Sequence, residues 1–139
     1  MNTKLLEKTI KSIQEEPRRL DMRNWAKQVN PTNPKNPPCG TKACIAGHVA
    51  FCSGKLAFNE NGLSEIKGEP NMFVANWARE ALKLNSEQAD RLFYFARWNE
   101  GIGWPKQFSV AYNKAKTAKQ RAKVAIARIR HFIKTEGEE

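Results

Sequence analysis

Hydrophobic residues recur along this chain with the three-to-four-residue spacing of α-helices. In the first segment, one arc of a helical wheel carries the residues Leu5, Leu6, Thr9, Ile10 and Ile13. Charged side chains lie opposite this arc, and Pro17 ends the segment. After Pro70 a second arc contains Phe73, Val74 and Trp77. Comparable patterns follow at residues 86–96, 108–112 and 117–135, with Ser86 and Thr117 as candidate N-caps of the first and the last. The chain is therefore predicted to be mainly α-helical.

One segment is apolar on every face. Between residues 43 and 52 the only strongly polar side chain is His48. A helix of this kind is surrounded by other elements of the fold. Thr41 follows a proline-rich loop and is a candidate N-cap. We therefore expect a buried central helix over about residues 42–53.

Residues 55–68 lack the helical pattern. Short apolar stretches flank a turn at Asn59–Gly62, which predicts either a short β-hairpin or an irregular loop. There is no internal repeat and no boundary long enough to separate two domains. The expected fold is thus a single globular domain, residues 1–139: a mainly α, compact bundle of five or six helices around the central helix.

The charge balance narrows the class of partner. The chain has 24 basic and 14 acidic residues, with a formal net charge of +10. Such an excess favours contact with nucleic acid, an anionic membrane or an acidic protein, although a solvated basic surface could simply confer solubility.

No apolar run approaches the roughly 20 residues of a membrane span, and the first residues lack a secretion signal. Three cysteines suit free thiols, so we expect a cytoplasmic protein without membrane association.

The last predicted helix, residues 117–135, carries most of this charge. Five cations fall on one narrow stripe beside its apolar arc: Lys116, Lys119, Lys123, Arg130 and Lys134. Arg121 and Arg128 occupy the other flank. The stripe suits a phosphate backbone, and we take it as the candidate nucleic-acid-binding site. The alternative is an ordinary solvated face of an amphipathic helix.

A cysteine–histidine cluster suggests metal chemistry. Cys39, Cys44, His48 and Cys52 lie within 14 residues, and zinc accepts such ligands. On one helix, however, Cys44 and Cys52 would be separated by about 12 Å, too far apart for one ion. We therefore expect no metal or other cofactor, and a buried, hydrogen-bonded histidine among apolar thiols.

The same cysteines are candidate nucleophiles. Cys39 or Cys44 near a helix N-terminus would have a thiolate stabilised by the helix dipole, with His131 as the remaining base. Nothing marks an orienting group or an oxyanion site. We therefore predict that the protein is not an enzyme and has no catalytic residues; a zinc-binding or cysteine-based enzyme is the remote alternative.

The stretch Cys39-Gly40-Thr41-x-x-Cys44-Ile45-Ala46-Gly47 resembles a motif of small uncharacterised proteins from bacteria and their phages. Residues 82–93, 104–105 and 129–133 also resemble those proteins. The resemblance implies kinship without an established activity.

Two functions are therefore open. The first is a nucleic-acid-binding accessory protein that uses the basic stripe. The second is a phage or mobile-element protein that binds and modulates an acidic host protein, using charge and exposed aromatic residues. Tyr94, Phe95 and Trp98 either form such an exposed patch or meet the loop at residues 101–105.

Overall fold

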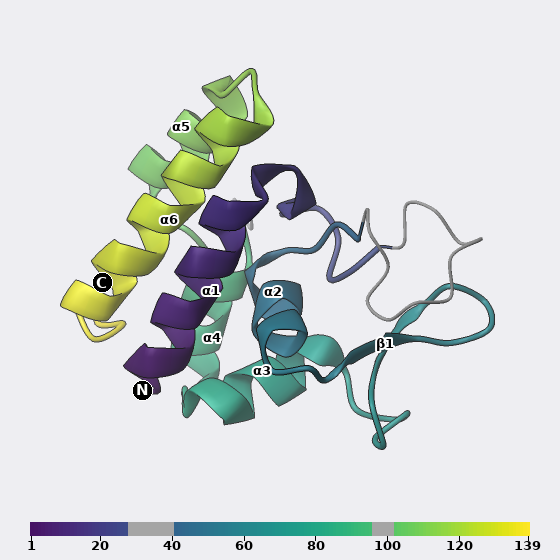
Figure 1. Ribbon diagram of the computed structural model, residues 1–139. Helices are drawn as coiled ribbons and strands as arrows, with labels where there is room; N and C mark the ends of the chain where they lie inside the picture. Colours follow the sequence, from purple (N-terminus) through teal and green to yellow (C-terminus); the bar gives the residue numbers. More distant parts are fainter. Residues whose placement is uncertain (28–40, 96–101) are drawn as a thin grey trace.

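The computed structural model describes residues 1–27, 41–95 and 102–139. Within these ranges the chain forms six α-helices, one 3-10 helix (η1) and a two-stranded antiparallel hairpin (Figure 1). Their order along the chain is α1 (Thr3–Glu15), η1 (Pro17–Arg19), α2 (Ile45–Cys52), β1 (Leu56–Phe58), β2 (Ser64–Ile66), α3 (Val74–Leu82), α4 (Ser86–Phe93), α5 (Lys106–Lys114) and α6 (Ala118–Lys134). The predicted mainly α fold of five or six helices is confirmed.

Helix α2 is the centre of this domain. All six residues from Ile45 to Ala50 are buried, and the helix packs against both α1 and α3 (Figure 1). Because its side chains are apolar on every face, each face stabilises the fold by contact with a neighbouring element. The prediction of a buried central helix is therefore confirmed.

The start of this helix differs from the prediction. The backbone of Lys42 exchanges two hydrogen bonds with that of Lys27, at 2.9 and 2.6 Å. These bonds hold the chain extended before the helix, so Cys44 becomes the N-cap residue. Thr41 is buried outside the helix, and its predicted capping role is wrong. The proline-rich loop itself lies outside the described residues.

Capping boxes define the starts of two outer helices. Thr117 caps α6 as predicted, and Gln120 completes a capping box by accepting from the Thr117 backbone N–H. Helix α4 begins with the same device, but its cap is Asn85 with Gln88 rather than Ser86. Each box pairs backbone N–H groups that the first turn of a helix cannot pair by itself.

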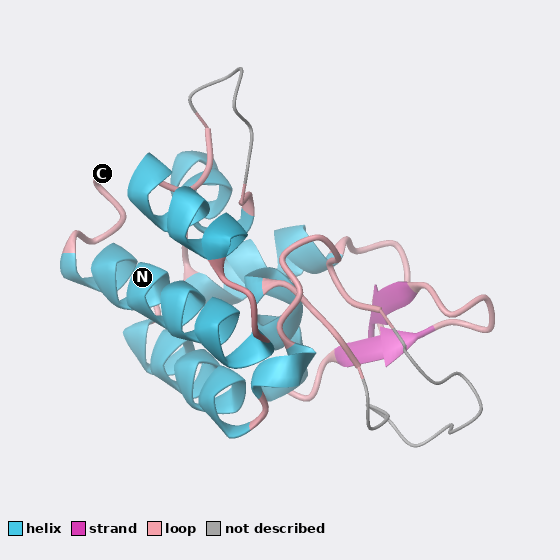
Figure 2. Ribbon diagram, turned by 90° about the horizontal axis from the view of Figure 1, so that it is seen from above, coloured by secondary structure: helices cyan, strands magenta, loops and turns pink. Residues whose placement is uncertain are grey.

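Residues 56–66 form the predicted hairpin. Leu56 pairs with Ile66, and the side chain of Asn59 accepts from the N–H groups of Asn61 and Leu63 in the turn. Gly62 has a φ of +75°, a conformation that favours glycine. The hairpin projects from the side of the domain away from α6 (Figures 1 and 2).

The backbone after η1 crosses α2 at Gly47. A Cβ atom at this position would lie 1.9 Å from the carbonyl oxygen of Trp25 and 2.6 Å from the Cβ of Ala43. Cys44 holds the same crossing: its N–H donates to the carbonyl of Asn24 at 2.7 Å, and its Sγ contacts the carbonyl of Trp25 at 3.7 Å. The Cys44 and Gly47 of the sequence motif thus seat the Asn24–Trp25 backbone on the central helix.

Replacing Gly47 with alanine is expected to displace this crossing, because the obstructing atom belongs to the backbone and cannot rotate away. We expect Gly47→Ala to lower the free energy of unfolding by about 2 kcal/mol, since overpacking outweighs the gain in helix propensity. Chemical denaturation measures this loss. In a background with Cys39 and Cys52 replaced by serine, the thiol of Cys44 should react faster with a disulfide reagent.

A substitution at another position of α2 separates this effect from a general loss of stability. Ala50→Gly weakens the same helix by about 1–2 kcal/mol through helix propensity and the loss of a buried methyl group, and Cys44 should stay protected. A Gly47→Ala protein as stable as the parent, with Cys44 equally protected, would contradict the account of the crossing.

Candidate nucleic-acid interface

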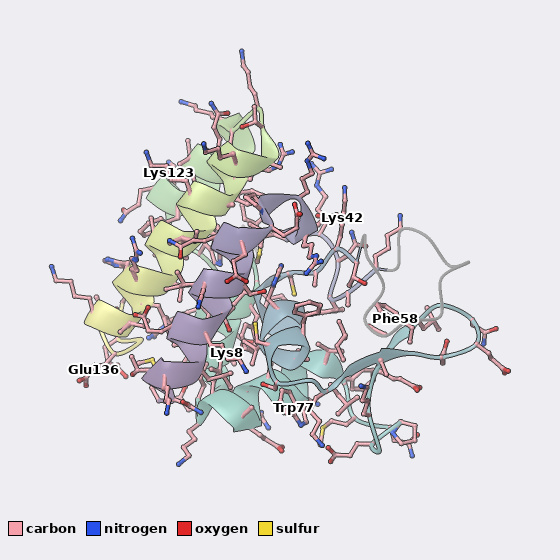
Figure 3. The ribbon with its side chains drawn as sticks, in the orientation of Figure 1. Lys8, Lys42, Phe58, Trp77, Lys123 and Glu136 are labelled. Atoms are coloured by element: carbon pink, nitrogen blue, oxygen red, sulfur yellow. The ribbon has the colours of Figure 1, made fainter. Side chains whose placement is uncertain are left out.

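The five predicted binding residues lie on one exposed helix and at its start. Lys119, Lys123, Arg130 and Lys134 belong to α6, and Lys116 comes just before its N-cap. All five are exposed. Figure 3 shows Lys123 on the outer side of α6, away from α1. We call these five residues the basic stripe.

The packing of α6 explains why the stripe faces outward. The helix contacts both α1 and α5. Its buried residues follow the predicted apolar arc and are Ala122, Ala125, Ile126, Ile129 and Phe132, together with Arg128. Because the buried side is anchored on two helices and the first turn is capped, the orientation of the stripe is fixed.

Acidic groups do not neutralise the stripe locally. Between residues 101 and 135 the sequence contains nine lysines and arginines and no aspartate or glutamate. Among the ion pairs formed within the described part of the chain, none involves a residue of the stripe. The positive field of this helix face is therefore open to a partner.

Arg128 does not belong to that field. The helical wheel places it on the flank of the apolar arc opposite the basic stripe, but its side chain is fully buried. Its guanidinium pairs with the carboxylate of Glu139 at 2.6 Å, donates to the carbonyl of Arg91 at 2.9 Å and lies over the ring of Phe132. Arg128 therefore holds the segment after α6 against α4 and α6. One signal was present in the sequence, since Arg128 borders the apolar arc four residues before Phe132.

The candidate zinc ligands do not converge. Cys44 and Cys52 lie at opposite ends of α2, where the Sγ of Cys44 contacts Trp25 and that of Cys52 contacts the carbonyl of Lys8 at 3.8 Å. Cys39 lies outside the described residues. Across residues 1–27, 41–95 and 102–139 no group of three histidine, cysteine, aspartate or glutamate side chains could hold a metal ion.

Burial keeps the thiols of Cys44 and Cys52 protonated. It raises the pKa of Cys44 to about 11, although this residue is the N-cap of α2. It also raises the pKa of the half-buried Cys52. The expected stabilisation of a thiolate by the helix dipole is therefore outweighed by desolvation at Cys44.

His48 is buried, as predicted, but its ring nitrogens are poorly supplied with hydrogen-bond partners. Its Nδ1 lies 3.5 Å from the hydroxyl oxygen of Ser12, and its Nε2 has no hydrogen-bond partner among the described residues. Burial lowers its pKa from 6.5 to about 4. The imidazole is therefore neutral in the folded protein at neutral pH and packs as part of the core.

The aromatic residues after α4 have different surroundings. Phe95 packs against Trp104 and Tyr112, with ring centroids 5.4 and 4.8 Å apart, so it meets the loop before α5. Tyr94 makes an edge contact with Trp25 at 5.4 Å. Trp98 lies outside the described residues.

Sequence reasoning missed two exposed apolar residues. Phe73 was expected on the inward arc of a helix, but its side chain is 77% exposed. The helix begins one residue later, and Phe73 is its N-cap with extended backbone. Trp25 is also exposed.

Comparison with known proteins does not assign this chain to a family. No protein-family model, curated protein or solved structure matches this chain. None of the helices within the described ranges combines the length and apolar character that a membrane crossing requires. The function is therefore inferred from the residues themselves.

The pKa of His48 predicts how stability depends on pH. Below pH 6.5 the unfolded chain takes up a proton at His48, whereas the folded chain does not until about pH 4. The free energy of unfolding should therefore fall as the pH drops through this window, by about 3 kcal/mol from this residue. Denaturation curves between pH 7 and 4 measure the slope. His48→Gln should show a shallower slope, and equal slopes in both proteins would rule out this role for His48.

Proposed function

We propose that this protein binds nucleic acid through its phosphate backbone, using the basic stripe of α6. The observation that carries the proposal is the exposure of five cations on one fixed helix face, in a stretch of 35 residues without an acidic side chain. Contacts of this kind position a protein on nucleic acid without reading its sequence.

The dimensions of the stripe support a backbone contact. Helix α6 has 17 residues and is therefore about 25 Å long. One strand of a duplex presents a phosphate about every 3.4 Å along the axis, so the stripe can lie beside about seven phosphates. The fixed orientation of the helix reduces the entropy lost when its lysines bind.

The energetics of the free protein favour this role over a merely solvated face. Lys119 and Lys123 are four residues apart, as are Arg130 and Lys134, and like charges at this spacing destabilise a helix. Acidic partners that would relieve the repulsion are missing from this stretch of sequence. An anionic polymer along the stripe would relieve it.

We further propose that the protein is a binding protein rather than an enzyme, and that it works in a bacterial cytoplasm. The raised thiol pKa values of Cys44 and Cys52 oppose cysteine-based catalysis. The two thiols are free, in agreement with a reducing compartment. The motif resemblance to bacterial and phage proteins supports the choice of host.

Reversing three charges of the stripe tests the proposal. We expect Lys119→Glu, Lys123→Glu and Arg130→Glu, combined, to weaken binding to a labelled 20-base-pair DNA duplex by about 100-fold or more at low salt. For the parent protein, log K should fall with log salt at a slope of about −4.5 if five phosphates are contacted. Fluorescence anisotropy measures both quantities, and arms with duplex RNA and single-stranded DNA distinguish the polymers.

A second triple variant controls for net charge. Lys4, Lys55 and Lys83 are exposed and lie outside α6, and their replacement by glutamate lowers the formal charge by the same six units. This variant should keep most of the parent affinity. The proposal fails if the parent does not bind any of the polymers at low salt, or if both variants lose binding equally.

A further inference from the structure

Exposed apolar side chains gather on the side of the domain that carries the hairpin. Within the described residues the large hydrophobic side chains that are exposed are Met1, Trp25, Leu63 and Phe73. Trp25 and Phe73 line one surface hollow of about 510 Å³, and Leu63 adjoins its lining residue Ser64. Phe73 and Leu63 are 77% and 64% exposed. Large apolar side chains exposed around one hollow are typical of an interaction site.

Three separate parts of the chain hold this surface in place. The crossing at Gly47 fixes the backbone of Trp25. Tyr94, at the end of α4, packs against the indole ring of Trp25. Leu63 follows the hairpin turn and pairs with Lys27. Phe73 is the N-cap of α3. Anchors that are already fixed in the free protein lose little entropy when a partner binds.

A second hollow lies beside the first. It measures about 270 Å³ and is lined by residues that include Trp25, Tyr94 and Phe95. Trp25 and Tyr94 line both hollows and therefore form the wall between them. Two adjacent hollows suit two apolar side chains presented by one segment of a partner.

The charge around the hollows is uneven. On the Trp25 side, Arg23, Lys27 and Lys42 are exposed. The nearby carboxylate of Asp21 is engaged, because it accepts from the N–H of Arg23 and from the side chain of Asn24. The acidic Glu65 and Glu69 lie on the other side, next to the lining residues Ser64 and Pro70. The cationic rim on one side complements a partner that carries acidic residues beside its apolar anchors.

We propose that these two hollows dock a protein segment with two apolar anchors and acidic flanking residues. The surface is distinct from the basic stripe, because the described residues that line the two hollows include none of α6 and none of the stripe. The interaction does not depend on nucleic-acid binding.

A set of synthetic peptides tests this docking surface. Each peptide carries two leucine or phenylalanine anchors, three, four or seven residues apart, flanked by glutamates; matched peptides carry lysine in place of glutamate. We expect at least one acidic peptide to bind the full chain with a dissociation constant of about 10–100 μM. Its lysine counterpart should bind at least about tenfold more weakly.

Two variants locate the binding. Phe73→Ala should weaken binding of the acidic peptide by about tenfold. The melting temperature of this variant should match that of the parent protein, because the Phe73 side chain is largely exposed. The triple glutamate variant of α6 should bind the peptide as the parent does, which separates this proposal from nucleic-acid binding.

Four results would overturn the proposal. The first is that no acidic peptide binds at 1 mM. The second is that the lysine peptides bind as tightly as the acidic ones, or that the Phe73→Ala protein binds the acidic peptide as tightly as the parent does. The third is a parent dimer in sedimentation experiments that Phe73→Ala dissociates, because a second copy of the chain would then occupy the hollows. The fourth is competition by a single-stranded oligonucleotide that itself requires Phe73, because bases would then be the occupants.

Discussion

The approach of the Trp25 carbonyl to Gly47 is the contact on which the arrangement of this domain depends. The 1.9 Å separation that a Cβ atom would have at this position leaves room for glycine alone. With the Asn24–Trp25 backbone seated there, Cys44 bonds to it, and Lys27, which follows it, pairs with Lys42 before α2 begins. The Cys39–Gly47 sequence motif thus has a structural explanation in two of its residues.

Periodicity predicted the elements whose environment is set locally. The apolar segment around His48 became the buried α2, and the cations of α6 emerged on its exposed face. Thr117 caps α6 as predicted, because a capping box requires only residues three apart. These features depend on neighbours along the sequence, which a helical wheel represents well.

Other features depend on contacts between distant segments, and sequence reasoning missed them. Thr41 does not cap α2, because the pairing of Lys42 with Lys27 holds the chain extended before the helix. Arg128 is buried by a partner, Glu139, that lies beyond the predicted helix. Phe73 is exposed because α3 begins after it. No local pattern specifies such pairings, since each needs the folded positions of two separate segments.

The account assigns nucleic-acid binding to the face of α6 and not to the aromatic side of the domain. The most direct test is a titration of the isotopically labelled protein with a 20-base-pair duplex, followed by amide and indole NMR signals. The account predicts shifts at Lys119, Lys123, Ala127 and Arg130, which diminish as salt is added, and no shift of the Trp25 indole. Shifts confined to Trp25 and its surroundings, or no shifts at low salt, would contradict it.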